Sequence, residues 1–216
     1  QLAGQRVDDV LTLKGESLSV QIYSRCATVM DSVSRRNATL SKIHRKSFTQ
    51  DLAPPSNAVV LFDGTSTDAF AGGKINDEGL LEVGPIFKTT VRDFRLHLEF
   101  RTPYMPYARG QSRGNSGIYI QRRYEVQVLD SFGLKGAANE CGGLYRQKSP
   151  DINMCFPPLA WQTYDIYFVA ARFDDEGKKI LDGVITVLHN GVAVHERYAL
   201  KNKTGAGQKE GATPGP

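Results

Sequence analysis

Apolar and polar residues alternate with a period of two in several short stretches of this chain. The clearest stretch is Phe94-Arg95-Leu96-His97-Leu98-Glu99-Phe100-Arg101, and residues 118–121, 124–128 and 162–168 follow the same pattern. Successive residues of a strand point to opposite faces of its sheet, so this alternation predicts half-buried β-strands.

Turn-forming sequences separate these stretches. Asn190-Gly191 lies between residues 184–188 and 192–195, and this dipeptide favours the positive φ angles of a type I′ hairpin turn. Residues 27–40 are the one segment that we consider for a helix, although their apolar positions are irregular. Regularly spaced antiparallel strands predict an all-β fold, a two-sheet sandwich or jelly roll.

The chain divides at a proline-rich segment. Ala53-Pro54-Pro55-Ser56-Asn57 is typical of a linker, because prolines supply no amide donors to a sheet. We therefore expect residues 1–56 to form an N-terminal extension with short strands and residues 57–216 to form the jelly-roll domain. The tail from residue 201 to 216 is polar and rich in glycine and lysine, and we expect it to be mobile.

Composition and charge exclude two classes of function. Of the 216 residues, 40% are hydrophobic, which is enough for a sizeable core. The 27 basic and 23 acidic residues give a net charge of +4, without the concentrated basic face that nucleic acid requires. No apolar run approaches the ~18 residues that span a bilayer. We therefore expect neither a nucleic-acid partner nor a membrane span.

The cysteines match no zinc-binding spacing. Cys141 and Cys155 flank a loop-like stretch, and we expect them to form a disulfide that leaves Cys26 unpaired; the alternative is three buried thiols in a reducing compartment. The sequence starts at Gln1 without a signal peptide. A processed secreted or periplasmic protein would begin in this way, as would an incomplete chain.

The polar sides of the strands carry the candidate chemistry. His97, Glu99 and Arg101 share one side of the first strand, and Glu125 and Gln127 share one side of another. If these strands are neighbours in one sheet, their side chains form one surface suited to sugars, with polar groups for the hydroxyls and Trp161 for the ring face. The alternative is the ordinary solvated face of an antiparallel sheet.

The same strands supply few carboxylates for a standard glycosidase, which needs two of them roughly 5–10 Å apart. Glu125 is followed at i+2 by Gln127, and Asp130 falls at an odd offset. A second carboxylate would have to come from Glu99 or from elsewhere. His97 is the best candidate for proton transfer, whereas we expect His189, next to the Asn-Gly turn, at the surface.

Seven motifs between residues 57 and 200 together resemble the 3-keto-disaccharide hydrolase family, formerly a domain of unknown function. Their order and spacing also fit, which makes the resemblance fairly specific. The motifs are Val59-Val60-Leu61-Phe62-Asp63-Gly64-Thr65, Asp93 to Arg101, Gly114-Asn115-Ser116-Gly117-Ile118-Tyr119, Tyr124 to Asp130, Gly143-Leu144-Tyr145, Trp161-Gln162-Thr163-Tyr164-Asp165, and His189-Asn190-Gly191-Val192.

This resemblance implies a concanavalin A-like jelly roll with a concave sugar-binding face, and cleavage of glycosides already oxidised at C3. A C3 ketone acidifies the proton on C2, so a single carboxylate can remove it before the aglycone leaves C1 and water adds. A general acid or a cation would assist, which makes a divalent metal ion the candidate cofactor. Family members end in a further strand, and we expect this domain to lack it.

From strand parity and motif position, Glu125 is our candidate base or metal-interacting carboxylate, and His97 and Asp130 are candidate proton donors. The leading hypothesis is a hydrolase or lyase acting on oxidised glycosides. The alternatives are a non-catalytic carbohydrate-binding module of the same fold and a purely structural sandwich. The candidate substrate-binding residues are Glu99, Arg101, Asn115, Tyr119, Gln127, Tyr145 and Trp161.

Overall fold

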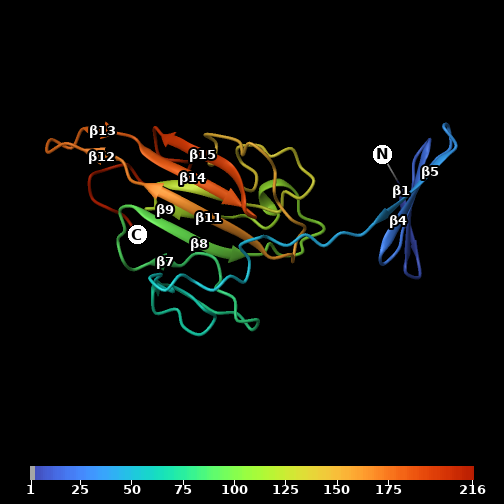
Figure 1. The fold of residues 1–216 in the computed structure, drawn as a ribbon, viewed down its shortest axis with the longest axis horizontal. Helices are drawn as coiled ribbons and strands as arrows, with labels where there is room; N and C mark the ends of the chain where they lie inside the picture. The colour runs from blue at the N-terminus through green and yellow to red at the C-terminus, as the bar shows by residue number, and fades with distance from the viewer. Residues whose placement is uncertain (1–2) are drawn as a thin grey trace. The chain divides into compact units, whose positions relative to one another are not determined.

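The computed structural model describes residues 3–216, which separate into two compact units, residues 3–45 and 46–216 (Figure 1). The first unit is a five-stranded antiparallel meander in chain order. Leu13 pairs with Val20, which pairs with Val29, so apolar side chains align on one face. The strands are β1 (Ala3–Val7), β2 (Val10–Lys14), β3 (Leu18–Ile22), β4 (Cys26–Asp31) and β5 (Arg36–Ser41).

The helix considered for residues 27–40 is wrong, because this segment forms the β4–β5 hairpin. The Asp31 carboxylate accepts hydrogen bonds from the amides of Val33 (2.9 Å) and Ser34 (3.3 Å). Arg35 has a φ of 54°, in the left-handed region where a helix cannot continue. The turn thus overrides a weak helical signal.

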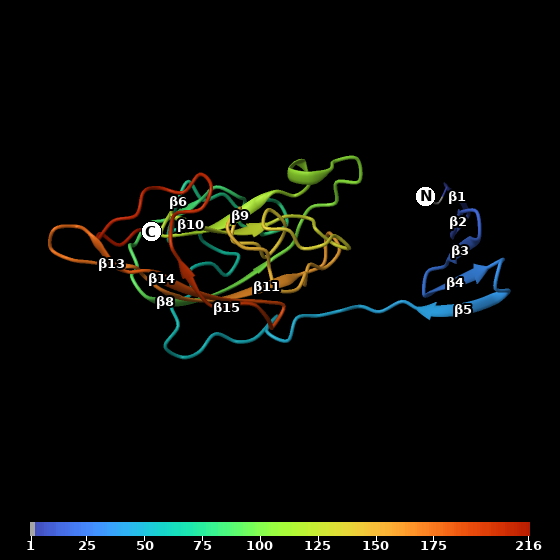
Figure 2. The same ribbon diagram turned by 90° about the horizontal axis from the view of Figure 1, so that it is seen from above.

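The second unit contains two antiparallel sheets in separate layers (Figure 2). One sheet has the strand order β15-β14-β11-β8, and the other pairs β10 with β9. Short pairs β6–β7 and β12–β13 and one 3-10 helix, η1, complete the unit. The bounds are β6 (Phe70–Ala71), β7 (Ile86–Phe87), β8 (Phe94–Phe100), η1 (Gly110–Ser112), β9 (Ser116–Ile120), β10 (Tyr124–Val128), β11 (Gln162–Val169), β12 (Arg172–Phe173), β13 (Lys179–Leu181), β14 (Gly183–His189) and β15 (Val192–Leu200).

The core of this unit lies between the two sheets. The Tyr124 ring of β10 packs against Phe168 of β11, with ring centroids 5.8 Å apart. The Tyr164 hydroxyl of β11 donates to the Gln127 carbonyl oxygen of β10 at 2.7 Å. The sheets therefore stack apolar face to apolar face, and the predicted all-β sandwich of jelly-roll type is confirmed. No helix within residues 3–216 has the length and apolarity to cross a membrane.

The Asn190-Gly191 hairpin is also confirmed. Both residues have positive φ angles, 53° and 79°, and His189 pairs with Val192 across the turn. The expected surface position of His189 is wrong: its side chain is fully buried and stacks on the Phe100 ring at 6.0 Å. Strand alternation places it on the core side, because β14 continues up to the turn itself.

Two segments outside the sheets are held firmly. The hydroxyls of Ser47 and Thr49 lie 2.6 and 2.8 Å from Thr163 Oγ1 of β11, so the structural boundary at Arg45 precedes the predicted one at residue 56. The tail expected to be mobile is instead hydrogen-bonded: the amides of Thr204 and Gln208 donate to the carbonyl oxygens of Arg123 and Arg122 at 2.9 and 2.7 Å.

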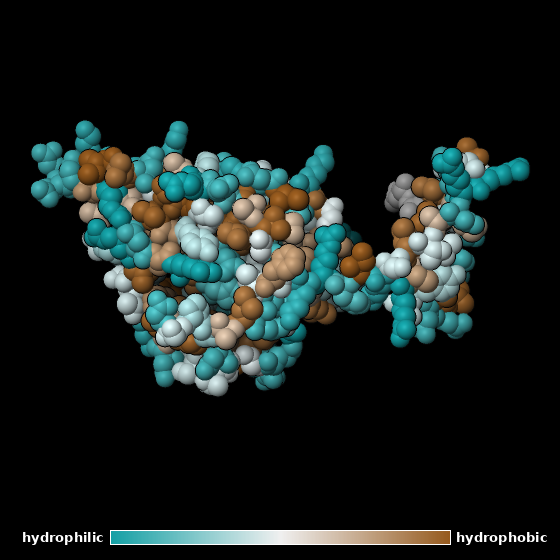
Figure 3. All heavy atoms as spheres, viewed as in Figure 1, coloured by the Kyte–Doolittle hydropathy of each residue, from teal (hydrophilic) through white to brown (hydrophobic). Residues whose placement is uncertain are grey.

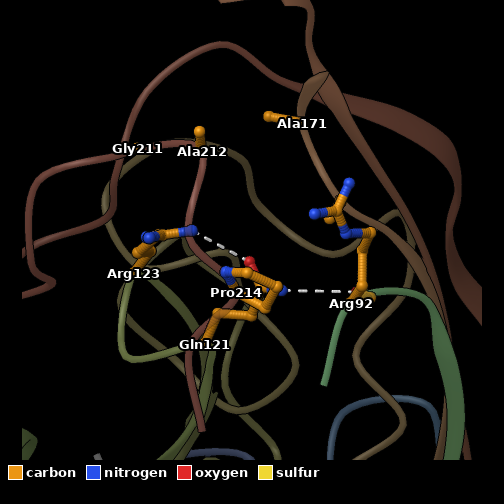
Figure 4. Close-up of a pocket in the computed structure, with 8 residues that line it drawn as sticks. Arg92, Gln121, Arg123, Ala171, Gly211, Ala212 and Pro214 are labelled. Carbon is orange, nitrogen blue, oxygen red and sulfur yellow. Dashed lines mark hydrogen bonds between the residues drawn. The ribbon is translucent and has the colours of Figure 1, made fainter. Parts of the chain in front are cut away.

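The end of the tail closes over a small cavity of about 10 Å³ (Figure 4), a volume suited to a single water. Arg123 donates to the Thr213 carbonyl oxygen at 2.7 Å, and Gln121 donates to the Val91 carbonyl oxygen at 2.6 Å. The tail is therefore part of the folded unit and shapes its surface.

Hydrophilic and hydrophobic residues are interspersed over the visible surface of both units (Figure 3).

Candidate functional site

Glu125 occupies the centre of the outer face of β9 and β10. It alternates with Tyr124 and Val126, which point into the core, so its side chain points away from the core. It is nevertheless only 7% exposed. The Tyr119 hydroxyl, on the directly paired residue of β9, donates to Glu125 Oε2 at 2.7 Å. We call Gln111, Asn115, Tyr119, Glu125 and Gln127 the Glu125 cluster.

Gln127 links the members of this cluster and is completely buried. In the flipped orientation of its amide, the nitrogen donates to the Ser116 carbonyl oxygen at 2.8 Å and to Glu125 Oε1 at 3.1 Å. The amide oxygen then lies 3.1 Å from both Asn115 Oδ1 and Gln111 Oε1. Both carboxylate oxygens of Glu125 are thus held by donors from neighbouring positions.

A glycine makes room for the Glu125 carboxylate. Gly117 pairs with Gln127 on the adjacent strand, and a Cβ atom at position 117 would lie 2.9 Å from the Glu125 carboxylate carbon. Any side chain there would displace the carboxylate. Gly117 of β9 therefore permits the close approach of a carboxylate from the neighbouring strand.

The tail covers the Glu125 carboxylate from the solvent side. Thr204 is fully buried, and its Oγ1 accepts a hydrogen bond from the Glu125 amide at 2.6 Å. A Cβ atom at Gly205 would lie 3.6 Å from Glu125 Oε2 and 3.2 Å from Tyr145 Cε1. Sequence reasoning missed Thr204 and Gly205, because a polar tail rich in glycine carries no signal of burial.

The electrostatics of the cluster favour proton transfer. Burial raises the pKa of the Glu125 carboxyl above its ordinary value, and the hydrogen bond from Tyr119 opposes this rise. Burial, together with the neighbouring Glu125 carboxylate, raises the pKa of the Tyr119 phenol far above its usual range. The ionised Glu125 is therefore a stronger base than an exposed glutamate, beside a hydroxyl that stays protonated.

A second set of predicted residues lies on the outer face of β8 and β11. His97 pairs with Asp165 and Glu99 pairs with Thr163 across these adjacent strands. His97 Nδ1 lies 2.9 Å from Asp165 Oδ1, and its Nε2 lies 3.7 Å from Glu99 Oε1. Near the ends of the strands, the Arg101 guanidinium lies 5.5 Å from the Trp161 ring centroid and forms an ion pair with Glu78.

The prediction that all these residues share one surface is wrong. Glu125 and Gln127 belong to the β10–β9 sheet, whereas His97 and Glu99 belong to the β8–β11 sheet in the other layer. The core separates the two outer faces. Alternation along a strand identifies its polar side correctly, but it does not identify which strands are neighbours. The structure thus brings Tyr119, Asn115, Gln127 and Tyr145 to Glu125, and leaves His97, Glu99, Arg101 and Trp161 apart.

The remaining predicted residues have structural partners. Asp130 is 4% exposed, and its Oδ2 lies 3.0 Å from Arg113 Nε. The expected disulfide is absent, because Cys141 and Cys155 are buried free cysteines. The Cys141 Sγ atom lies 3.2 Å from the Tyr164 hydroxyl oxygen, consistent with the alternative of buried thiols. Across residues 3–216, no group of three or more His, Cys, Asp or Glu residues is arranged to hold a metal ion.

The two stacked antiparallel sheets place the second unit among the β-sandwich proteins. The chain is similar to the crystal structure of a candidate glycosyl hydrolase from Parabacteroides distasonis ATCC 8503, with a TM-score of 0.68, 33% sequence identity and 75% of each chain covered. A second candidate glycosyl hydrolase from that organism matches with a TM-score of 0.42 and 14% identity over 63% of this chain and 70% of the other.

The family model of the 3-keto-α-glucoside-1,2-lyase-like domain matches residues 57–216. The chain therefore belongs to this family, and the resemblance recognised in the sequence is confirmed. No curated protein matches the chain.

Proposed function

We propose that the chain cleaves glycosides that carry a ketone at C3, with Glu125 as the base. The observation that carries this proposal is a buried carboxylate with a raised pKa, held beside the Tyr119 hydroxyl, in a domain of the 3-keto-α-glucoside-1,2-lyase-like family. A base whose pKa is raised toward neutral pH abstracts protons more effectively than an ordinary carboxylate.

The chemistry needs one base and one proton donor. Glu125 takes the C2 proton, the electron pair of that C–H bond passes into the enolate of the C3 ketone, and the C1–oxygen bond then breaks. The electrons of the enolate form the C1=C2 double bond, and the aglycone leaves with the electron pair of the C1–oxygen bond and takes up a proton. Water then adds to the resulting enone and gives the 3-keto sugar. Tyr119 is the proton donor nearest to Glu125, because the earlier candidate His97 lies in the other layer.

The other members of the site would bind the sugar. Asn115 is exposed and offers its amide group to hydroxyls, and Tyr145 offers an aromatic face. The fully buried Gln127 positions Glu125 instead. Glu99 lies in the other layer, so it is not available as a carboxylate partner of Glu125. This arrangement favours elimination over direct hydrolysis by two carboxylates.

The test is incubation of the full chain with 3-keto-trehalose and with a 3-keto-glucoside deuterated at C2, with and without a chelator. We expect release of 3-keto-glucose, loss of the C2 label and abolition of turnover in Glu125→Gln. The matched control, Glu99→Gln on the other layer, keeps its activity. Retained turnover in Glu125→Gln contradicts the assignment, and loss of turnover with chelator identifies a divalent metal ion as a cofactor.

The second candidate function is a carbohydrate-binding module. It is favoured by the low exposure of Glu125, which is covered by Thr204 and Gly205. Calorimetry with glucosides and their 3-keto forms separates the two functions: binding without turnover supports the module, and neither binding nor turnover supports a structural sandwich. The secreted or periplasmic location stays a prediction, which cell fractionation tests.

A further inference from the structure

Side chains from outside the Glu125 cluster hold both ends of the segment that covers Glu125, in addition to the backbone hydrogen bonds of Thr204 and Gln208 described above. We call residues 201–210 the strap. On one side, Gln147 Nε2 donates to the carbonyl oxygens of Asn202 and Lys203 at 2.7 and 2.8 Å. At the other end, the Glu210 carboxylate accepts from the Tyr124 hydroxyl and from Lys179 Nζ, the latter at 3.0 Å. Both holding points lie outside the Glu125 cluster.

Between these two points the strap packs directly on the Glu125 cluster. Thr204 accepts a hydrogen bond from the Glu125 amide, and Gly205 lies against both Glu125 Oε2 and the Tyr145 ring. A Cβ atom at position 205 would lie 2.7 Å from Tyr145 Cδ1. The contact is therefore too close for even one added methyl group, and much too close for a sugar ring.

This packing conflicts with the geometry that proton abstraction requires. A base must come within hydrogen-bond reach of the atom that carries the proton, ≈ 2.6–3.2 Å between heavy atoms. Glu125 is only 7% exposed, and Tyr119 and Gln127 already occupy its two oxygens on the sheet side. The remaining approach is from the side on which Gly205 lies.

We propose that the strap is a lid, and that a glycoside reaches Glu125 only when Thr204 and Gly205 lift from the sheet. This inference rests on the proposed function. Gln147 and Glu210 stabilise the closed lid together with the backbone hydrogen bonds of Thr204 and Gln208. Lifting breaks the hydrogen bond between Thr204 Oγ1 and the Glu125 amide. The closed state therefore protects that amide from hydrogen exchange and the Glu125 carboxylate from reagents in the solvent.

The test measures access to the Glu125 carboxylate without relying on turnover. Carbodiimide with glycine ethyl ester converts accessible carboxylates to amides, and peptide mass spectrometry follows the modification of Glu125. One net hydrogen bond corresponds to a factor of roughly 2–12 in an equilibrium. We therefore expect Gln147→Ala and Glu210→Gln each to speed labelling of Glu125 and hydrogen exchange of its amide by about 3- to 10-fold.

Two controls show whether the change in labelling is specific to the contacts that hold the strap. Gln208→Ala changes an exposed strap side chain and leaves labelling of Glu125 unchanged, while exposed Asp77 reports the reactivity of a free carboxylate. Gln147→Glu removes the donor at nearly constant size and repeats the effect if Gln147→Ala unfolds the unit. The lid proposal is contradicted if Glu125 of the unmodified chain is labelled at the rate of Asp77. It is also contradicted if Glu125 is labelled at the same rate in all variants.

Turnover measurements separate this inference from the proposed function. If both hold, Gln147→Ala raises kcat/KM for a 3-keto-glucoside along with the labelling rate. Faster labelling in a chain that never turns over the substrate supports the lid and contradicts the function. Turnover with a labelling rate that neither variant changes supports the function and contradicts the lid.

Discussion

Two buried histidines make the second unit sensitive to acid. His189 and His195 are both fully buried. Burial lowers the pKa of His189 to about 3 and the pKa of His195 to about 4, and no hydrogen-bond partner of either Nδ1 atom occurs within residues 3–216. The folded chain therefore keeps both imidazoles neutral at a pH where the unfolded chain protonates them.

The sign and size of the effect follow from proton linkage. An unfolded imidazole has a pKa of about 6.5, above both folded values, so the stability contribution is complete above that pH. It is lost as pH falls from about 6.5 toward 4 for His195 and toward 3 for His189. At pH 5 each histidine costs about 2 kcal/mol, or about 4 kcal/mol together. Typical total stabilities are about 5–15 kcal/mol.

Urea unfolding at pH 7 and pH 5 measures this loss. Trp161 is the only tryptophan of the chain, so its fluorescence reports the second unit alone. The raised pKa of Glu125 acts with the opposite sign and reduces the loss somewhat. In His195→Gln, which keeps a donor for the Gly142 carbonyl oxygen, the difference between the two pH values shrinks by about 2 kcal/mol. Equal stability of the unmodified chain at pH 7 and 5 refutes this reasoning.

Two further predictions concern Glu125, and a third concerns the buried Asp130 carboxylate. The kcat/KM for a 3-keto-glucoside rises with pH through a pKa above that of a free glutamate, because burial raises the pKa of Glu125; a rate profile flat from pH 4 to 8 contradicts a carboxylate base. Gly117→Ala displaces the carboxylate and lowers turnover at least about tenfold, while circular dichroism shows the fold retained. Arg113→Ala leaves buried Asp130 unpaired and lowers the unfolding free energy by about 3 kcal/mol, which Arg113→Lys partly restores in thermal melts.

The sequence predicts strands and their core sides well because both are local properties. The alternation in β8, β10 and β11 shows which residues face the core, and Asn190-Gly191 shows where a hairpin turns. Which strands lie side by side depends on contacts distant in the chain. Glu99 and Glu125 therefore have the predicted orientation within their strands, yet they lie in different layers.

The composition of the tail does not reveal that it packs on the sheet, for a similar reason. Thr204 is buried because backbone groups of Arg123 and the side chain of Gln147 bind this stretch. None of these contacts appears as periodicity or as an apolar run. Asn115, Tyr119, Glu125 and Gln127 were candidate site residues from strand parity and motif position, whereas Gln111 and the segment that covers Glu125 were found only in the three-dimensional structure.

The hydrogen bond from Tyr164 to the Gln127 carbonyl oxygen has a consequence for mechanical coupling in the domain. This phenol connects the backbone of β10, on which Glu125 lies, to a strand of the opposite layer. We expect substitutions that loosen β11 to shift β10 and so to alter the position of Glu125, although they lie far from its side chain.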